Sequence, residues 1–275
     1  MSGESRSNFA PAFLFLPRPK REALRAVYAY CRLIDDIVDS GAWPEAEARR
    51  QLDFWREEVE RLFAGRPTHA VAQSLLPHVA AFRLPKEAFL EMIRGCSLDL
   101  EGTRYRTPEE LESYMRGVAS SVGLLAVEIF GYRSTPPERI REFATLFGYA
   151  FQLTNIIRDV GADLELGRIY LPASDMEAAG YTMKSLMLRE HNAAFGSLMA
   201  ALYRRAKTYY QRARSLVDFR DRPGLVAAEV MAHVYEGLLE EIRENHFRVL
   251  FHRSSLSSWR KTVLAGKGWL YCHGL

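Results

Sequence analysis

The sequence predicts an all-α fold, and three observations support that prediction. Prolines stand before long segments in which apolar residues recur at three- and four-residue spacing, the spacing of a helix with one buried side. Alternating β-branched runs bounded by turns are absent from the sequence, as are Asn-Gly and Asp-Gly hairpin dipeptides. No internal repeat or Ser/Gly-rich linker divides the chain. We therefore expect residues 1–275 to form one all-α domain of roughly eight to ten helices.

The expected helices follow the prolines in chain order. Pro is favoured in the first turn of a helix because its missing N–H needs no partner there. Such prolines are Pro19, Pro44, Pro85, Pro108, Pro137 and Pro223. The fourth of these helices has the clearest start, because Thr107 can cap it and Pro108 fits its first position. Two glutamates then follow near its positive end.

The composition is that of an ordinary globular protein that is long enough to bury a core. Hydrophobic residues make up 48% and charged residues 26% of the 275 residues. The formal net charge of +3 gives no reason to expect a nucleic-acid partner, but it suits acidic ligands or anionic lipid. Three cysteines without CxxC spacing argue against a disulfide framework and a structural zinc site, and they indicate a reducing compartment. We find neither a signal peptide nor an apolar run long enough to span a bilayer, so we expect a cytoplasmic protein.

The segment YCRLIDDIVDS, residues 30–40, places three aspartates within five positions of an otherwise apolar helix. The polar residues here fall at offsets 0, 4, 7 and 11, which puts them on one helix face. They are Tyr28, Arg32, Asp35 and Asp39, and we call them the first stripe. Apolar residues fill the surrounding positions: Leu24, Val27, Cys31, Ile34, Ile37 and Val38.

A second segment, FQLTNIIRDVGADLELGRIYLP at 151–172, has nearly the same arrangement. Its polar residues have offsets 0, 3, 7 and 11 and form the second stripe: Gln152, Asn155, Asp159 and Asp163. A single DxxxD pair on a helix most often marks a solvent-exposed face. Two matching stripes, each enclosed by apolar residues, favour the alternative that they face each other in the interior. Buried carboxylates are tolerable there only when they are paired or bound to a metal.

Magnesium is the cation that these residues suit. Aspartates four residues apart lie on successive turns of one helix face and can share one hard cation. The ligands are all oxygen and no HExxH motif competes, so we expect several Mg²⁺ ions shared with a diphosphate. The sequence has no GxxxxGK[ST] or GxGxxG loop that would hold phosphate in another way. Arg32, Arg158 and Arg168 can bind diphosphate bidentately, although neutralising the aspartates explains each one equally well.

Five segments of the chain resemble the squalene/phytoene synthase family of head-to-head prenyl synthases. They are SNFAPAFLFLP, AVYAYCRLIDDIVD, DLEGTRYRTPEELESYMRGVASSVGLLAVEIFGY, QLTNIIRDVGADLELGRIYLP and AAEVMAHVYEGLLEEI. Through the TRY and VASSVGL stretches, the chain is most similar to the presqualene diphosphate synthases of bacterial hopanoid biosynthesis. The resemblance implies a class I isoprenoid synthase helical bundle with a central cavity. It also implies a prenyltransferase that condenses two farnesyl diphosphates to presqualene diphosphate in a Mg²⁺-dependent ionisation.

The resemblance also implies roles for individual residues. Metal ligands would be Asp35, Asp39, Asn155, Asp159 and Asp163. Contacts with the prenyl diphosphates would come from Tyr28, Arg32, Gln152 and Arg158. A lid or cavity wall would include Ser7, Asn8, Phe9 and Tyr114, with Tyr235 lining the site and Arg253 binding diphosphate. The catalytic set would be Asp35, Asp39, Asp159, Asp163, Arg32 and Tyr28. The stretch GCSLDL at 95–100 departs from relatives that carry a Met/Glu pair before the aspartate, which leaves the role of Ser97 open.

Other functions fit the same residues. Phytoene or dehydrosqualene synthesis would use the same diphosphate site with a different cavity depth or cation rearrangement. Squalene synthesis would need NADPH, and we expect none because the expected product is presqualene diphosphate. The sequence has no dinucleotide-binding motif, but the resemblance implies that related enzymes can bind NADPH without one. A catalytically silent scaffold relative would be expected to lose stripe aspartates, and all four are present.

The C-terminal stretch WRKTVLAGKGWLYCHGL mixes cations with aromatic residues. Its cations are Arg260, Lys261 and Lys267, and its aromatic residues are Trp259, Trp269 and Tyr271. One hypothesis is a peripheral contact with the membrane surface, where an oily product would be released. A final core helix with a loose tail explains the stretch equally well.

Overall fold

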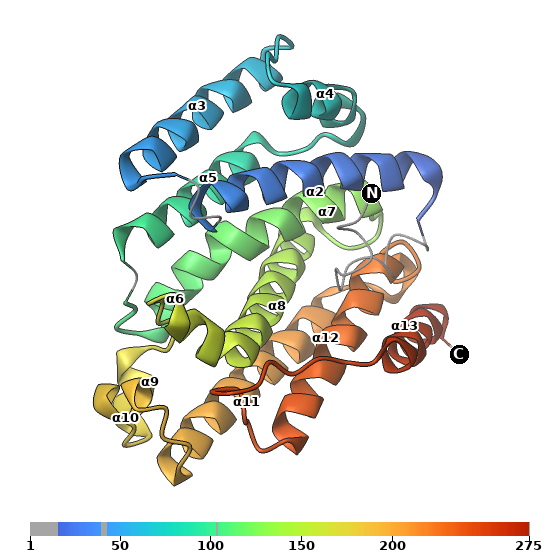
Figure 1. Ribbon diagram of the computed structural model, residues 1–275. Coiled ribbons are helices and arrows are strands. Elements are labelled where there is room, and N and C mark those ends of the chain that lie inside the picture. Colours follow the sequence, from blue (N-terminus) through green and yellow to red (C-terminus); the bar gives the residue numbers. More distant parts are fainter. Residues whose placement is uncertain (1–15, 40–42, 103, 275) are drawn as a thin grey trace.

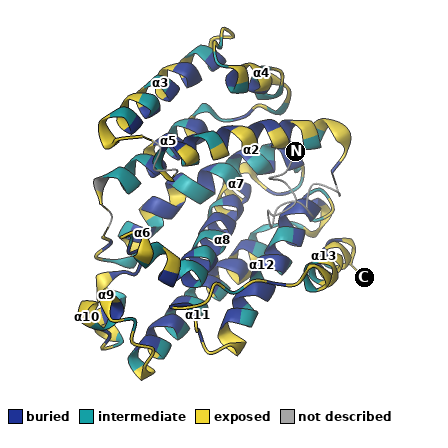
Figure 2. Ribbon diagram, viewed as in Figure 1, coloured by how far each residue is buried: buried dark blue, intermediate teal, exposed yellow. Residues whose placement is uncertain are grey.

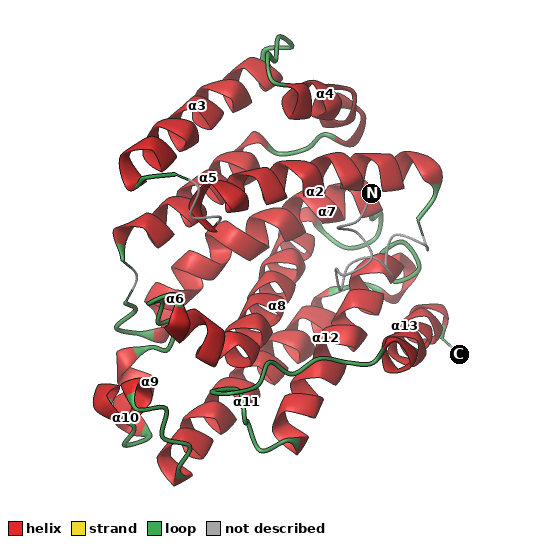
Figure 3. Cartoon of the chain, viewed as in Figure 1, coloured by secondary structure: helices red, strands yellow, loops and turns green. Residues whose placement is uncertain are grey.

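The computed structural model describes residues 16–39, 43–102 and 104–274, and Figure 1 shows their arrangement. These residues form twelve α-helices and no β-strand, which confirms the all-α prediction (Figure 3). The helices are α2 Arg18–Asp39, α3 Glu45–Phe63, α4 Ala70–Phe82, α5 Lys86–Leu98, α6 Pro108–Met115, α7 Ser121–Phe130, α8 Pro137–Glu165, α9 Ala173–Ala178, α10 Met183–Met187, α11 Ala193–Leu216, α12 Val226–Glu244 and α13 Ser258–His273. The expected eight to ten helices were too few because α9 and α10 are only six and five residues long.

The prolines mark helix starts as predicted. Pro108 and Pro137 are the first residues of α6 and α8, and Pro44 and Pro85 immediately precede α3 and α5. The Thr107 hydroxyl accepts a hydrogen bond from the Glu110 N–H at 3.4 Å, as a helix cap should. Pro223 lies three residues before α12, in the turn that connects the short 3₁₀ helix η4, Phe219–Asp221, to α12.

The longest helix, α8, runs through the middle of the molecule (Figure 1). It contacts α7 on one side and α11 and α12 on the other, and its middle part, from Phe143 to Ile157, is largely buried (Figure 2). Helices α2, α5 and α7 pack together, and α3 and α4 cover α2 and α5 from outside. Both helices that carry a polar stripe, α2 and α8, are therefore flanked by other helices, which is why apolar residues surround each stripe.

One wide helical turn interrupts the path from α6 to α7. Residues Arg116–Ser120 form the π-helix η3, a wider turn that accommodates one residue more than the same length of α-helix. The turn lies against α5 at a contact between two glycines. A Cβ atom on Gly95 would lie 2.7 Å from Gly117 Cα, so only glycine fits at this crossing.

No helix in the described ranges is both long enough and apolar enough to cross a membrane.

Candidate active site

A cavity of about 480 Å³ lies among α2, α7, α8 and α12. Its wall is largely apolar, with contributions from Leu24, Val27, Met92, Val118, Val122, Val127, Phe130, Phe143, Phe147, Phe151 and Met231. The polar residues gather where the C-terminal half of α2 faces the C-terminal half of α8. The cavity thus joins a charged region to an apolar chamber, the shape needed for a ligand with one anionic end and a long hydrocarbon tail.

The whole first stripe lines this cavity. Tyr28, Arg32, Asp35 and Asp39 follow one face of α2, while Tyr30 and Ile34 on the opposite side are fully buried in the core. The next residue after Asp35 in sequence, Asp36, points away from the cavity and pairs with Arg32 at 2.8 Å. The stripe spacing therefore predicted which aspartates face inward.

Three of the four residues of the second stripe line the same cavity. Gln152, Asn155 and Asp159 face the first stripe from α8, joined by Arg158. Asp163, one turn further along α8, borders a smaller adjoining pocket with Arg168. The structure thus places the first stripe and three residues of the second stripe around one space, and Asp163, which was expected there too, lies at the adjoining pocket.

Arginines pair closely with one aspartate of each stripe, and Arg32 lies at the longer distance of 3.4 Å from Asp35. Arg158 binds Asp159 through two hydrogen bonds, the longer at 2.8 Å, and Arg253 binds the same carboxylate from the segment after α12 at 2.8 Å. Burial opposes the ionisation of Asp159, but hydrogen bonds from these two arginines outweigh it and hold its pKa below the usual value. Arg168 pairs with Asp39 at 2.7 Å and so connects the end of α8 to the end of α2.

Two other stripe carboxylates lack sufficient positive charge around them. Burial, with repulsion from Asp39, raises the pKa of Asp35 to about 6. Burial, with repulsion from Asp159, raises the pKa of Asp163 to about 7. These carboxylates would ionise more readily with a cation nearby, so the electrostatics of the cavity favour an added positive charge.

The donor set fits magnesium when a phosphate completes the coordination. The Asn155 Oδ1 atom is buried and accepts no hydrogen bond, which leaves a carbonyl-type oxygen free to bind a hard cation. In the described part of the chain, no group of three or more His, Cys, Asp or Glu residues is close enough to hold a metal ion alone. Mg²⁺ commonly takes only one or two protein carboxylates and completes its shell with substrate phosphate and water. The stripes therefore suit a metal bound together with a diphosphate.

A half-buried carboxylate that the sequence analysis did not assign, Asp99, lies near the first stripe. Asp99 accepts hydrogen bonds from the Tyr170 hydroxyl at 2.9 Å and the Tyr114 hydroxyl at 3.2 Å. Burial is the main reason that its pKa rises to about 6, and Asp39 adds repulsion. The only sequence signal was its place in the divergent stretch GCSLDL. Ser97 in that stretch donates to the carbonyl of Arg94 in its own helix.

The position of Tyr114 corrects one expectation. Tyr114 does not line the cavity, because its ring packs against the rings of Tyr105 and Tyr170 and its hydroxyl points to Asp99. Tyr235 does line the cavity, where its ring lies 4.9 Å from that of Phe151. The expected lid residues Ser7, Asn8 and Phe9 lie outside the described residues.

A close backbone contact brings Arg253 to the second stripe. The N–H of Gly161 in α8 donates to the Val249 carbonyl at 3.2 Å. A Cβ atom on Gly161 would overlap the Leu250 carbonyl oxygen and would lie 2.7 Å from the Val249 oxygen. The chain after α12 can therefore lie directly on α8, and Arg253 follows three residues later beside Asp159.

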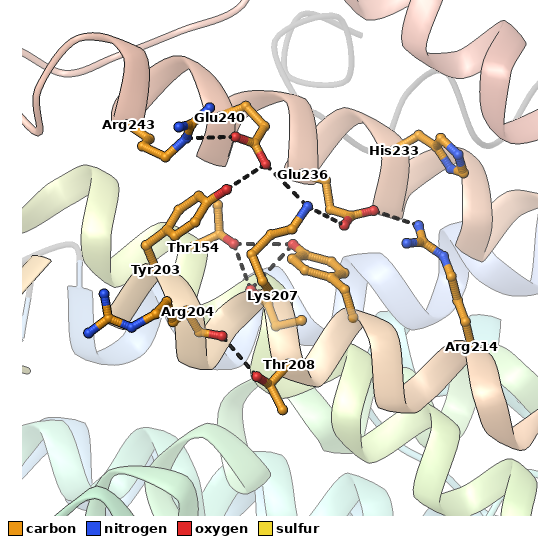
Figure 4. Close-up of polar contacts among 12 residues, drawn as sticks. Thr154, Tyr203, Arg204, Lys207, Thr208, Arg214, His233, Glu236, Glu240 and Arg243 are labelled. Atoms are coloured by element: carbon orange, nitrogen blue, oxygen red, sulfur yellow. Dashed lines mark hydrogen bonds and ion pairs between the residues drawn. The ribbon is translucent and has the colours of Figure 1, made fainter. Parts of the chain in front are cut away.

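A polar network joins α11 and α12 (Figure 4). Lys207 lies 3.0 Å from Glu236 and 3.1 Å from Glu240, while Arg214 lies 3.0 Å from Glu229 and 2.6 Å from Glu236. Burial raises the pKa of Glu229, and its ion pair with Arg214 opposes that change. The network fixes one side of α12, whose other side presents Ala228, Met231 and Tyr235 to the cavity.

Comparison with known proteins shows similarity along most of the chain. The family model for squalene/phytoene synthase matches residues 3–260. A 15-cis-phytoene synthase of Synechocystis is 33% identical over 266 residues, which cover 94% of this chain and 79% of the relative. A presqualene diphosphate synthase of Zymomonas mobilis is 35% identical over 246 residues, which cover 88% of this chain and 82% of the relative.

Solved structures with the same arrangement of helices include two synthases. A dehydrosqualene synthase in complex with ligand superimposes with a TM-score of 0.86 at 28% identity, covering 98% of this chain and 94% of that one. A squalene synthase from Alicyclobacillus acidocaldarius has a TM-score of 0.76 at 33% identity, covering 88% and 90%. These similarities confirm the predicted helical fold of isoprenoid synthases.

Proposed function

Because the chain belongs to the squalene/phytoene synthase family of prenyltransferases, we propose that it joins two farnesyl diphosphates head to head to form presqualene diphosphate. The observation that carries this proposal is the pair of aspartate stripes, with their arginines, at the charged end of an otherwise apolar cavity. An isoprenoid diphosphate has the same division into a charged head and an apolar tail. Relatives named presqualene diphosphate synthase support this product.

Phytoene synthesis is the second candidate. Relatives named phytoene synthase are about as similar to this chain as those named presqualene diphosphate synthase, at 33% and 35% identity for two of them. The substrate would then be geranylgeranyl diphosphate, whose tail is one isoprene unit longer. The same charged end would serve either substrate, so the choice depends on how the apolar chamber accommodates the tail.

The charged end would bind and activate the diphosphate. Arg32, Arg158 and Arg253 carry guanidinium groups that can form paired hydrogen bonds to its oxygens. Members of the family generally depend on divalent metals. Here Mg²⁺ would be held by Asp35, Asp39, Asn155, Asp159 and Asp163, and would supply positive charge that stabilises the departing diphosphate.

The apolar chamber would protect the reacting hydrocarbon. The C–O bond of one substrate breaks, the diphosphate leaves with the bonding electrons, and an allylic cation remains. The double bond of the second substrate attacks this cation, and loss of a proton closes the cyclopropane ring. Tyr28, Phe151 and Tyr235 line the cavity and can offer π faces to the cation, while the apolar wall excludes water that would trap it.

Exchange of single stripe aspartates tests the proposal. Asp35→Asn and Asp159→Asn should each lower product formation by at least about 100-fold, because a metal ligand is lost. Asp36→Asn is the matched control, since Asp36 neighbours Asp35 but faces solvent, and it should keep activity within a few fold. Mass spectrometry of products from farnesyl and geranylgeranyl diphosphate distinguishes presqualene diphosphate from phytoene. Full activity of Asp35→Asn would remove this residue from the proposed site.

The scaffold alternative has its own test. A wild-type protein that forms no product from either substrate, and that shows no Mg²⁺-dependent binding of a prenyl diphosphate in calorimetry, would be a catalytically silent relative. Binding that requires both Mg²⁺ and the diphosphate, and that Asp159→Asn weakens, would instead support the enzyme.

A further inference from the structure

The last helix, α13, has an inner face that is fixed against α12 (Figure 1). A Cβ atom on Gly268 would lie 2.8 Å from the Val230 Cα atom, so the two backbones nearly touch there. Leu264 packs into the space above Gly237 in the same way. Ala265 and Cys272 are buried on this face. These contacts fix the rotation of α13 about its axis, so its opposite face cannot turn inward.

The opposite face of α13 is apolar and exposed. Trp259, Val263, Gly266 and Leu270 have offsets 0, 4, 7 and 11, which places them in one line along the helix, and we call them the outer stripe. Their three side chains are 76%, 39% and 42% exposed, and a Cβ atom on Gly266 would meet nothing within 4 Å. Figure 2 shows α13 as mostly exposed. An apolar line of this kind normally marks a buried face, yet the described chain leaves it uncovered.

Positive charge accompanies the outer stripe. Residues 245–275 contain five Lys and Arg and no Asp or Glu, whereas the rest of the chain has a net charge of −2. Within α13, Arg260 pairs with Glu241 of α12. Among the described residues, Lys261 and Lys267 have no ion-pair partner. Lys267 lies beside the outer stripe, about 80° around the helix from Trp259, whereas Lys261 lies about 200° from Trp259, on the inner side.

We propose that the outer stripe of α13 docks the protein on the surface of an anionic membrane. Tryptophan side chains prefer the boundary between headgroups and acyl chains, and lysines beside an apolar helix face are attracted to anionic lipid. The stripe spans about 16 Å, so α13 would lie in the membrane surface rather than cross it.

A second copy of the chain suits this face less well. A two-fold interface places the same patch of each copy against the other. Pairing through α13 would therefore bring two basic segments together without any acidic residue from positions 245–275 to offset their repulsion. Anionic lipid offers the opposite charge.

Flotation of the full chain with lipid vesicles tests the proposal without using enzymatic activity. The protein should float with vesicles of phosphatidylcholine and phosphatidylglycerol, bind those of phosphatidylcholine alone more weakly, and dissociate as salt is raised. Trp259→Ala and Leu270→Ala should each weaken binding by about tenfold, since each removes apolar surface that the membrane would cover. Lys267→Gln should weaken binding roughly fivefold, whereas Lys261→Gln should change it little, because Lys261 lies on the side of α13 opposite the outer stripe.

Trp43→Ala is the matched control. Trp43 is 45% exposed but precedes α3, away from α13 (Figure 1), so its removal should leave vesicle binding unchanged. Thermal melts establish that each variant is folded. Equal binding by Trp259→Ala and the wild type would overturn the proposal. So would a dimer in sedimentation experiments that Trp259→Ala dissociates, combined with no binding to vesicles, because the outer stripe would then be an interface between copies.

Discussion

Replacing Gly161 by alanine should disrupt the contact that holds the chain after α12 on α8. The new methyl group would overlap the Leu250 carbonyl oxygen and lie 2.7 Å from the Leu250 carbonyl carbon. These are backbone atoms, so no side-chain rotation relieves the overlap. The segment must move away from α8, and the 3.2 Å hydrogen bond from the Gly161 N–H to Val249 should be lost with it.

The expected loss of stability follows from two opposing effects. Adding a methylene-sized group to a tightly packed site typically costs about 1–3 kcal/mol. Alanine in place of glycine within a helix recovers about 0.5–1 kcal/mol of this by limiting the unfolded chain. The net loss should be about 1–2 kcal/mol, and each kcal/mol lowers the Tm of a chain of this size by about 2–4 °C.

Urea denaturation and thermal melts measure this change, and Gly196→Ala provides the control. Gly196 also lies in a helix, but a Cβ atom there meets nothing within 4 Å, so its replacement should raise stability by about 0.5–1 kcal/mol. A loss of stability for Gly161→Ala together with a gain for Gly196→Ala would support the described contact. If Gly161→Ala is as stable as Gly196→Ala, the contact does not constrain the chain as described.

The same variant also tests how Arg253 is positioned. If the Gly161 contact brings Arg253 to Asp159, Gly161→Ala should weaken Mg²⁺-dependent diphosphate binding about as much as Arg253→Ala does. The double variant should then be no worse than either single variant, because both remove one interaction. Additive losses would show that Arg253 reaches Asp159 independently of this contact.

Two further predictions concern buried carboxylates. The pKa of Asp163 is about 7 in the folded chain and about 3.9 in an unfolded one, so the folded state binds more protons between these values. In metal-free protein, Asp163 should therefore contribute a loss of stability as the pH rises from about 4 to 7. Asp163→Asn should remove this contribution, so that the stability of the variant measured by urea titration with EDTA gains relative to the wild type over this pH range; an unchanged slope would contradict the assignment. Glu229→Gln should destabilise the protein by about 2 kcal/mol, because the largely enclosed Arg214 loses one of two anionic partners. Asp53→Asn, which breaks an exposed pair with Arg56, should cost under about 1 kcal/mol, and equal losses would refute this reasoning.

The sequence was sufficient to predict the two stripes because their geometry is local. Side chains at offsets 0, 4, 7 and 11 share one face of any α-helix, so Asp35 and Asp39 had to point the same way once α2 formed. The surrounding apolar residues then indicated that this face was enclosed. That the two stripes meet in one cavity was an inference from their similarity, and the packing of α2 and α8 is consistent with it.

Residues whose positions depend on distant contacts could not be predicted in this way. Asp99 is held by Tyr114, 15 residues away, and by Tyr170, 71 residues away. Nothing in the local pattern around Asp99 indicates either partner. The expectation that Tyr114 lines the cavity failed for the same reason, because stacking with Tyr105 and Tyr170 determines where its ring lies.

The wide turn η3 determines which side chains of the following helix, α7, face the cavity. Val122, Gly123, Ala126 and Val127 of α7 line the cavity after that turn. Rewinding Arg116–Ser120 to α-helical geometry without deleting a residue would rotate all later side chains by roughly 90–100°. The chamber wall would then be built from different residues of an unchanged sequence. Insertions and deletions of one residue in this turn are therefore a direct route to reshaping the space available to a hydrocarbon tail.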